Sequence, residues 1–94
     1  MITASARHIL VNDEQHCLQL KTELASGADF GLLAEQHSNC PSKLQGGALG
    51  SFSRGQMVKE FDDVVFTAEL HTVQGPIKTQ FGYHLIEVTN RTDK

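Results

Sequence analysis

The chain has 94 residues, of which 39% are hydrophobic and 20% charged, so it is expected to form one domain over residues 1–94 and not a disordered chain. This length leaves no room for a dinucleotide-binding domain beside a substrate domain. Lys and Arg number 8 and Asp and Glu 11, and the resulting net charge of -3 argues against nucleic acid or an anionic membrane as the main partner.

The first predicted element is a strand over the apolar run 6–11. Alternation puts Ala6, His8 and Leu10 on one face, and Ile9 and Val11 on the other. Because both faces carry apolar groups, this strand is expected in the centre of a sheet.

Two helices are expected next, joined by almost no loop. Asn12 or Asp13 can cap the first helix, which ends at Gly27, and Asp29 starts the second. Helical spacing places on one face of the first helix Cys17, Leu20 and Leu24, and on one face of the second Phe30, Leu33, Ala34 and His37. The short connection predicts that the two helices pack as neighbours.

Residues 38–55 form a polar stretch rich in glycine. Pro41 can open a short helical turn, and a short strand fits the isolated apolar residues Leu49 and Phe52. The segment 46–50 lacks the Lys-Ser/Thr pair of a phosphate-binding loop, so it predicts a tight turn with close backbone contact.

The rest of the chain predicts a helix over 58–68, a strand over 73–79, a turn at 80–82 and a final strand over 83–89. Gly75 and Pro76 mark the edge of a sheet or a bulge. The final strand places His84, Ile86 and Val88 on one face. The resulting order predicts an α+β domain with a small, mostly antiparallel sheet.

The N-terminal residues do not form a basic segment followed by an apolar one, and no apolar run approaches the length of a membrane span. Cys17 and Cys40 are interpreted as thiols, since a single bridge in a chain with an ordinary core is not a disulfide framework. These features predict a cytoplasmic protein. The mature form of a longer exported precursor would show the same pattern.

The five histidines fall into two groups. His16 and His71 lie in polar surroundings and are expected to be solvated, and His37 is expected to be a hydrogen-bonded structural residue. His8 and His84 lie inside apolar strands, and a buried histidine needs a hydrogen-bond partner. If the two strands are adjacent, these histidines can serve each other, which predicts a structural pair that fixes the strand register.

Two other patterns suggest chemistry but are weaker. Cys40 lies in a loop, and a loop cysteine with histidines elsewhere permits nucleophilic catalysis. A metal site from His8, His37, Cys40 and His84 is a further alternative, but no second close pair accompanies the His37–Cys40 spacing.

A small set of apolar residues could form a binding surface, although a place in the core is the simpler interpretation. Met57 and Phe61 lie four residues apart at a helix start, and Leu49 is isolated in a polar stretch. Phe81 lies in a turn beside Gly82, where core packing explains a large aromatic side chain less easily.

Five segments, in order and over nearly the whole chain, carry a resemblance to a known family. They are residues 6–11 (ARHILV), 28–34 (ADFGLLA), 37–42 (HSNCPS), 46–61 (GGALGSFSRGQMVKEF) and 75–84 (GPIKTQFGYH). Through them the chain resembles the parvulin family of peptidyl-prolyl cis/trans isomerases, and especially its small single-domain bacterial members.

The resemblance implies an α+β, FKBP-like fold in which four helices surround a four-stranded, mostly antiparallel sheet with the strands of His8 and His84 at its centre. It implies a catalytic set made of His8, Cys40, Thr79 and His84, and a pocket for the substrate proline made of Leu49, Met57, Phe61 and Phe81. It implies no cofactor and no metal. The implied partners are proline-containing peptides and unfolded or partly folded proteins, bound by a monomer.

Two roles are open for Cys40: attack on the substrate carbonyl, or adjustment of the electrostatic field around the histidines. The second is favoured, because an isomerase needs no covalent intermediate and some family members carry Asp at this position.

The chain departs from the family pattern at two places. Ala48 replaces an Asp, and Lys59-Glu60 stands where a Pro often precedes the helix Phe; neither belongs to the implied site. Phosphate-directed members carry a long basic loop after the first strand, whereas residues 12–15 are short and acidic, so no phosphate requirement is expected. The alternative function is a peptide-binding chaperone on the same fold without significant turnover.

Overall fold

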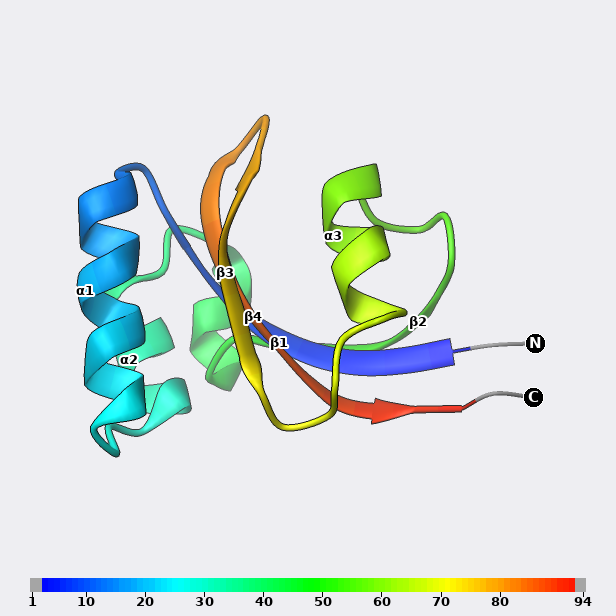
Figure 1. Cartoon of the computed structure of the whole chain (residues 1–94), viewed down its shortest axis with the longest axis horizontal. Coiled ribbons are helices and arrows are strands. Elements are labelled where there is room, and N and C mark those ends of the chain that lie inside the picture. Colours follow the sequence, from blue (N-terminus) through cyan, green and yellow to red (C-terminus); the bar gives the residue numbers. More distant parts are fainter. Residues whose placement is uncertain (1–2, 93–94) are drawn as a thin grey trace.

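The structure, a computed structural model, describes residues 3–92, so the two ends of the predicted 1–94 domain lie outside the described residues. The elements follow one another in the order shown in Figure 1: β1 (Thr3–Val11), α1 (Glu14–Ala25), α2 (Phe30–His37), the 3-10 helix η1 (Pro41–Gln45), β2 (Ala48–Ser53), α3 (Lys59–Val65), β3 (Val73–Thr79) and β4 (Gly82–Arg91). This is the predicted order of elements.

The four strands form one antiparallel sheet in the order β2-β1-β4-β3, so the central position predicted for the first strand is confirmed. β1 begins at Thr3, earlier than the predicted Ala6, because residues 3–5 pair with β2 through their backbones and Ala4 and Ser5 pair with β4 as well. Hydrophobic alternation does not detect such polar residues. The end of β4 lies beside the start of β1, where the backbone N–H of Thr92 donates to the carbonyl oxygen of Thr3 at 2.9 Å.

Helices cover both faces of the sheet, with α1 and α2 on one side and α3 on the other (Figure 1). Side chains from alternate positions of β1 and β4 divide the core into two clusters. The cluster under α3 contains Ala4, Ala6, Phe52, Phe61, Val65, Phe66, Ile86 and Val88. The cluster under α1 and α2 contains Ile9, Val11, Cys17, Leu20, Phe30, Leu33, Ala34 and Leu85.

Local signals account for most helix boundaries. Asp13 and Asp29 cap α1 and α2 by accepting hydrogen bonds from the backbone N–H groups of His16 and Leu32, and Pro41 starts η1. Of the four expected helices, three are α-helices and the fourth is η1 within the described residues. α3 ends at Val65, before the predicted residue 68, and continues only as hydrogen-bonded turns.

The glycine-rich segment brings two backbones into close contact, as its sequence predicts. Gly47 has a φ of 88°, and its carbonyl oxygen accepts a hydrogen bond of 3.0 Å from the backbone N–H of His8. A Cβ atom at Gly47 would lie 2.5 Å from the carbonyl oxygen of His8. This contact fixes the strand that carries His8 against the turn before β2.

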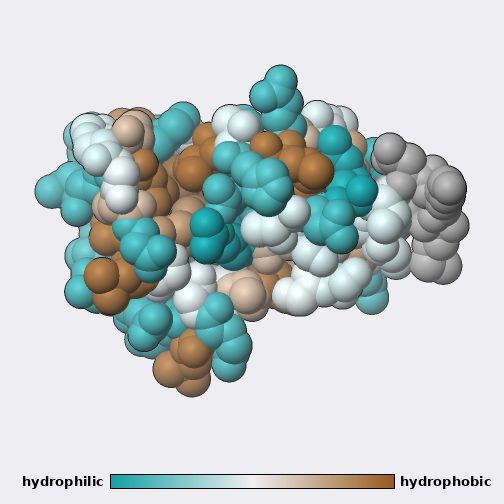
Figure 2. Space-filling view, turned by 90° about the horizontal axis from the view of Figure 1, so that it is seen from below, coloured by the Kyte–Doolittle hydropathy of each residue, from teal (hydrophilic) through white to brown (hydrophobic). Residues whose placement is uncertain are grey.

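Among residues 3–92, few large apolar side chains are exposed. Figure 2 shows hydrophobic residues in small separate patches among hydrophilic ones. The exposed large hydrophobic residues are Leu18, Leu32, Leu44, Leu70 and Phe81. Each helix described between residues 3 and 92 is too short or too polar to cross a membrane.

Candidate active site

The centre of the site is a pair of stacked histidines on the two central strands. His8 on β1 lies opposite Ile86, and His84 on β4 lies opposite Leu10, so the histidines are diagonal neighbours on one face of the sheet. Their Nδ1 atoms are 3.0 Å apart, and their rings lie 17° from parallel with centroids 5.2 Å apart. Both side chains are buried, and their contact through the Nδ1 atoms confirms the predicted pairing.

Thr79 contacts this pair at the ring nitrogen of His84 that faces away from His8. Its hydroxyl oxygen accepts a hydrogen bond of 3.1 Å from the backbone N–H of Phe81 and lies 2.7 Å from His84 Nε2. The oxygen accepts from Phe81, and its hydrogen can at the same time point to His84 Nε2, so Thr79 can donate to that atom. With Thr79 as the donor, His84 carries its own hydrogen on Nδ1 and donates it to His8 Nδ1; this direction is assigned because it gives the buried Thr79 hydroxyl hydrogen an acceptor.

The chain of donors ends at His8. A neutral His8 that accepts at Nδ1 carries its hydrogen on Nε2, and this atom is buried without a hydrogen-bond partner among residues 3–92. Burial, and to a smaller degree the neighbouring His84, lowers the pKa of His8 from 6.5 to about 4. Burial also lowers the pKa of His84. Both rings are therefore neutral at pH 7.

Phe61 lies on α3 and packs against both histidines from that helix. Its ring makes edge contacts with His8 and His84, at centroid distances of 5.6 and 5.8 Å.

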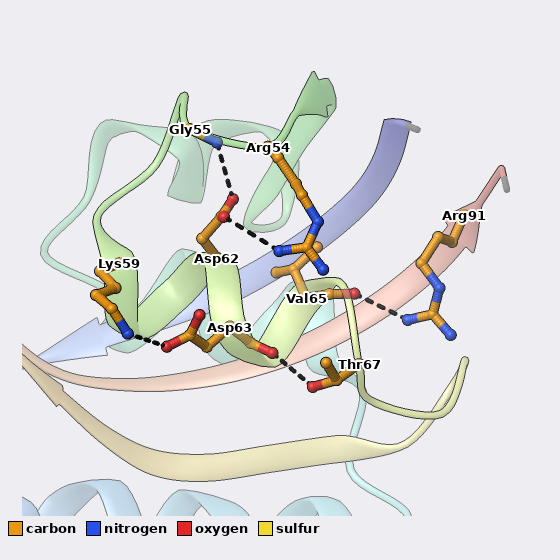
Figure 3. Close-up of polar contacts among 8 residues, drawn as sticks. All are labelled: Arg54, Gly55, Lys59, Asp62, Asp63, Val65, Thr67 and Arg91. Atoms are coloured by element: carbon orange, nitrogen blue, oxygen red, sulfur yellow. Dashed lines mark hydrogen bonds and ion pairs between the residues drawn. The ribbon is translucent and has the colours of Figure 1, made fainter. Parts of the chain in front are cut away.

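Polar contacts fix the two ends of α3, the helix that carries Phe61, as Figure 3 shows. Asp62 accepts from the backbone N–H of Gly55 at 3.3 Å, and Arg91 donates to the carbonyl oxygen of Val65 at 2.9 Å. The sequence gives no local sign of these contacts.

Cys40 reaches the same site from the loop after α2. The buried hydroxyl of Ser38 accepts hydrogen bonds from the backbone N–H groups of Leu10 and Cys40, at 3.0 and 3.3 Å. The N–H of Asn39 donates to the carbonyl oxygen of Leu10 at 2.7 Å. The loop is thus tied to β1 two residues beyond His8. Ser38 is a positioning residue that the sequence reasoning missed, although its place directly after an amphipathic helix marks it as a candidate cap.

These side chains surround one apolar cavity of about 550 Å³. Of the predicted site residues it is lined by His8, Cys40, Leu49, Met57, Phe61, Phe81 and His84, and the additional lining residues are Leu10, Asn39, Pro41, Gln56 and Val58. Thr79 is not among the lining residues of this cavity, and its hydroxyl contacts the histidine pair through His84 Nε2. Phe81 is 57% exposed and forms part of the rim.

Cys17 and Cys40 are free, as predicted. The prediction that His16 is solvated holds only in part: its side chain is partly exposed, but it is hydrogen-bonded to His37, because the start of α1 and the end of α2 meet. No group of three or more His, Cys, Asp or Glu side chains is placed to hold a metal ion in the described part of the chain.

An antiparallel sheet with a buried neutral histidine pair beneath an apolar cavity defines a parvulin-type domain. Residues 8–90 match the family model described as "Rotamase: PPIC-type PPIASE domain". The chain therefore belongs to the family of PPIC-type peptidyl-prolyl isomerase domains.

Individual relatives agree with this assignment. The foldase protein PrsA of Geobacillus sp. (strain WCH70) is 47% identical over 90 residues, which are 95% of this chain and 33% of the relative. The crystal structure of the peptidylprolyl isomerase PrsA from Bacillus anthracis has a TM-score of 0.95 at 36% identity, over 98% of this chain and 43% of that one. The chain spans about a third of the length of the curated relatives that it matches.

A shorter structure is matched over nearly its whole length. It is the solution structure of NmPin, the parvulin of Nitrosopumilus maritimus, with a TM-score of 0.85 and 37% identity over 96% of this chain and 98% of that chain. The described fold is therefore the size of a complete parvulin domain.

Proposed function

We propose that this chain catalyses cis/trans isomerisation of X-Pro peptide bonds in peptides and in unfolded or partly folded proteins. The observation that carries the proposal is the apolar cavity with Phe61, Met57 and Phe81 above a neutral histidine pair. The names of the relatives, which include a foldase and peptidylprolyl isomerases, support it.

Isomerisation of an X-Pro bond requires only that the protein bind the rotating amide and lower its barrier. Rotation about the peptide bond faces a barrier of about 18–20 kcal/mol that arises from amide resonance, and the uncatalysed exchange takes roughly tens to hundreds of seconds. A typical enzyme turnover requires that about 4–7 kcal/mol of this barrier be removed. The reaction breaks no bond to carbon, so neither a cofactor nor a covalent intermediate is needed.

The cavity can lower the barrier by its polarity. The planar amide is the more dipolar form, so water solvates it more strongly. The twisted amide therefore loses less solvation free energy when it enters an apolar cavity. An apolar cavity that encloses the proline ring therefore favours the twisted form. Because His8 and His84 are neutral, they place no net charge beside the rotating bond.

We further propose that the enzyme has no phosphate requirement and favours apolar residues before proline. Among the described residues, no Lys or Arg lines the cavity. Asp13 caps α1 and Glu14 lies in its first turn, so the segment after β1 would repel a phosphate. Comparison of turnover on Leu-Pro, Glu-Pro and phospho-Ser-Pro peptides tests this, and faster turnover of the phosphopeptide would contradict it.

The activity itself is tested by NMR exchange spectroscopy on a short Leu-Pro peptide, with no coupled protease. The wild-type protein should accelerate exchange, and Phe81→Ala should lose most of the acceleration, because Phe81 forms the cavity rim. Leu32→Ala is the matched control, since Leu32 is 51% exposed and does not line the cavity. Peptide binding without accelerated exchange would instead establish the chaperone alternative.

The role of Cys40 is tested in the same assay. We propose that its thiol tunes the site without forming a bond to substrate, so Cys40→Asp should retain activity. Loss of activity in Cys40→Asp, together with trapping of a tetrahedral adduct between the wild-type thiol and the substrate carbonyl carbon, would establish covalent attack.

A monomeric state and a cytoplasmic location complete the proposal. The two free thiols support a reducing compartment. Sedimentation analysis tests the first point. Fractionation of the source cells, with an antibody to the chain, tests the second.

A further inference from the structure

A second histidine pair lies outside the cavity, where α1 begins and α2 ends. His16 is in the first turn of α1, and His37 is the last residue of α2. His16 Nε2 and His37 Nδ1 are 3.3 Å apart, and the rings are nearly perpendicular, at 83° with centroids 5.1 Å apart. Both side chains are partly exposed, so solvent and small ions reach them. The isomerase mechanism uses neither ring.

The backbones of both histidines are fixed to the same part of the fold. Asp13 caps α1 by accepting a hydrogen bond of 3.3 Å from the backbone N–H of His16. Directly after His37, the Ser38 hydroxyl accepts from the N–H of Leu10 at 3.0 Å. The cap at Asp13 thus fixes the start of α1, and Ser38 ties the end of α2 to β1, so the two backbones have little conformational freedom left to lose when a ligand joins the rings.

The separation of the facing nitrogen atoms suits a metal ion. Imidazole nitrogens lie about 2.0–2.1 Å from Zn²⁺, and tetrahedral geometry then places two of them about 3.3 Å apart. This is the distance between His16 Nε2 and His37 Nδ1. We propose that these two atoms bind one divalent late-transition-metal ion, such as Zn²⁺, between α1 and α2.

The proton balance is simple. In the hydrogen-bonded pair one ring donates and the other accepts. On metal binding the donating ring moves its hydrogen to its other nitrogen, so that both facing atoms present a lone pair to the metal. Nothing is oxidised or reduced. Water completes the coordination, because the described residues hold no cluster of three or more ligating side chains.

Charge and chemistry favour this site over the buried pair in the cavity. Asp13 and Glu14 adjoin His16 and attract a cation, and the chain as a whole carries a net charge of -3. Imidazole ligands select Zn²⁺, Cu²⁺ or Ni²⁺ over Mg²⁺ and Ca²⁺. By contrast, Thr79 already occupies His84 Nε2, and the buried rings face Phe61 in an apolar cavity.

The experiment is a calorimetric titration of the protein with Zn²⁺, with Mg²⁺ as the control cation and the melting temperature measured with and without zinc. One Zn²⁺ should bind and raise the melting temperature, and Mg²⁺ should do neither. His16→Gln and His37→Gln should each weaken zinc binding at least about tenfold, because one of two linked ligands is lost. Their melting temperatures without metal establish that the variants are folded.

Two further variants are matched controls. His71→Gln removes an exposed histidine, and Cys40→Ser removes the thiol of the cavity; both should bind Zn²⁺ like the wild type. Absence of zinc binding, unchanged affinity in His16→Gln and His37→Gln, or loss of binding in Cys40→Ser would each overturn the proposal.

Discussion

Acidification should destabilise this protein through His8 before most of its carboxylates titrate. In the folded state burial and the neighbouring His84 lower the pKa of His8 from 6.5 to about 4. In the unfolded chain the same imidazole is solvated and keeps its ordinary pKa. Between these two values the unfolded state binds more protons than the folded state, so stability falls as the pH is lowered through this window.

The size of the effect follows from the shift. Each pKa unit corresponds to about 1.4 kcal/mol, so the full contribution of His8 is about 3 kcal/mol, gained as pH rises from about 4 to 6.5. By pH 5 about 2 kcal/mol of this should already be lost, while ordinary Asp and Glu side chains remain mostly ionised. A domain of this size has a total stability of roughly 5–15 kcal/mol, so the loss is readily measured.

The assay is urea unfolding at pH 8, 7, 6 and 5, followed by circular dichroism. His8→Gln removes the titrating ring while its amide oxygen can still accept from His84 Nδ1, and it should lose about 2 kcal/mol less than the wild type between pH 8 and pH 5. His71→Gln, which removes an exposed histidine, should keep the wild-type dependence. An equal pH dependence in His8→Gln and the wild type would refute the reasoning.

Three further predictions concern the packing around the histidines. Thr79→Val should lower the free energy of unfolding by about 1–3 kcal/mol, because buried His84 Nε2 loses its donor; Thr79→Ser keeps the hydroxyl and should lose less, as thermal melting will show. Phe61→Ala should cost about 3–5 kcal/mol in urea unfolding, since the side chain is 3% exposed, and a cost below 1 kcal/mol would contradict its place in the core. Gly47→Ala should melt at a lower temperature than Gly55→Ala: both glycines have positive φ, but only at Gly47 would a Cβ meet the backbone of His8. Equal melting temperatures would show that the contact is absent.

The elements of the fold are largely encoded in local sequence patterns. Alternation in β1, the caps Asp13 and Asp29, and Pro41 each specify structure through neighbouring residues, and all these predictions are confirmed. The adjacency of His8 and His84 is different in kind, since it joins strands from opposite ends of the chain. Periodicity indicates that each is buried, but only the family resemblance implies that their strands pair.

Most of the contacts that the sequence does not reveal are polar ones between distant segments. Ser38 ties its loop to Leu10, and Arg91 reaches the end of α3, yet the sequence around each shows an ordinary polar residue. The sequence likewise does not reveal the contact of His16 with His37, because the polar neighbours of His16 do not show that α2 ends beside it. Such pairings depend on how the helices pack on the sheet, which no local pattern encodes.

The pairing of Thr3 with Thr92 has a mechanical consequence. β1 and β4 are antiparallel neighbours whose outer ends lie together, so a force that separates these ends pulls across the strands and not along them. The backbone hydrogen bonds then break one after another from that end, as in a zipper, instead of sharing the load. Tension would travel along this pair toward His8 and His84, so stretching would open the end of the cluster under α3 that contains Ala4, Ala6 and Val88 before it reached the histidine network.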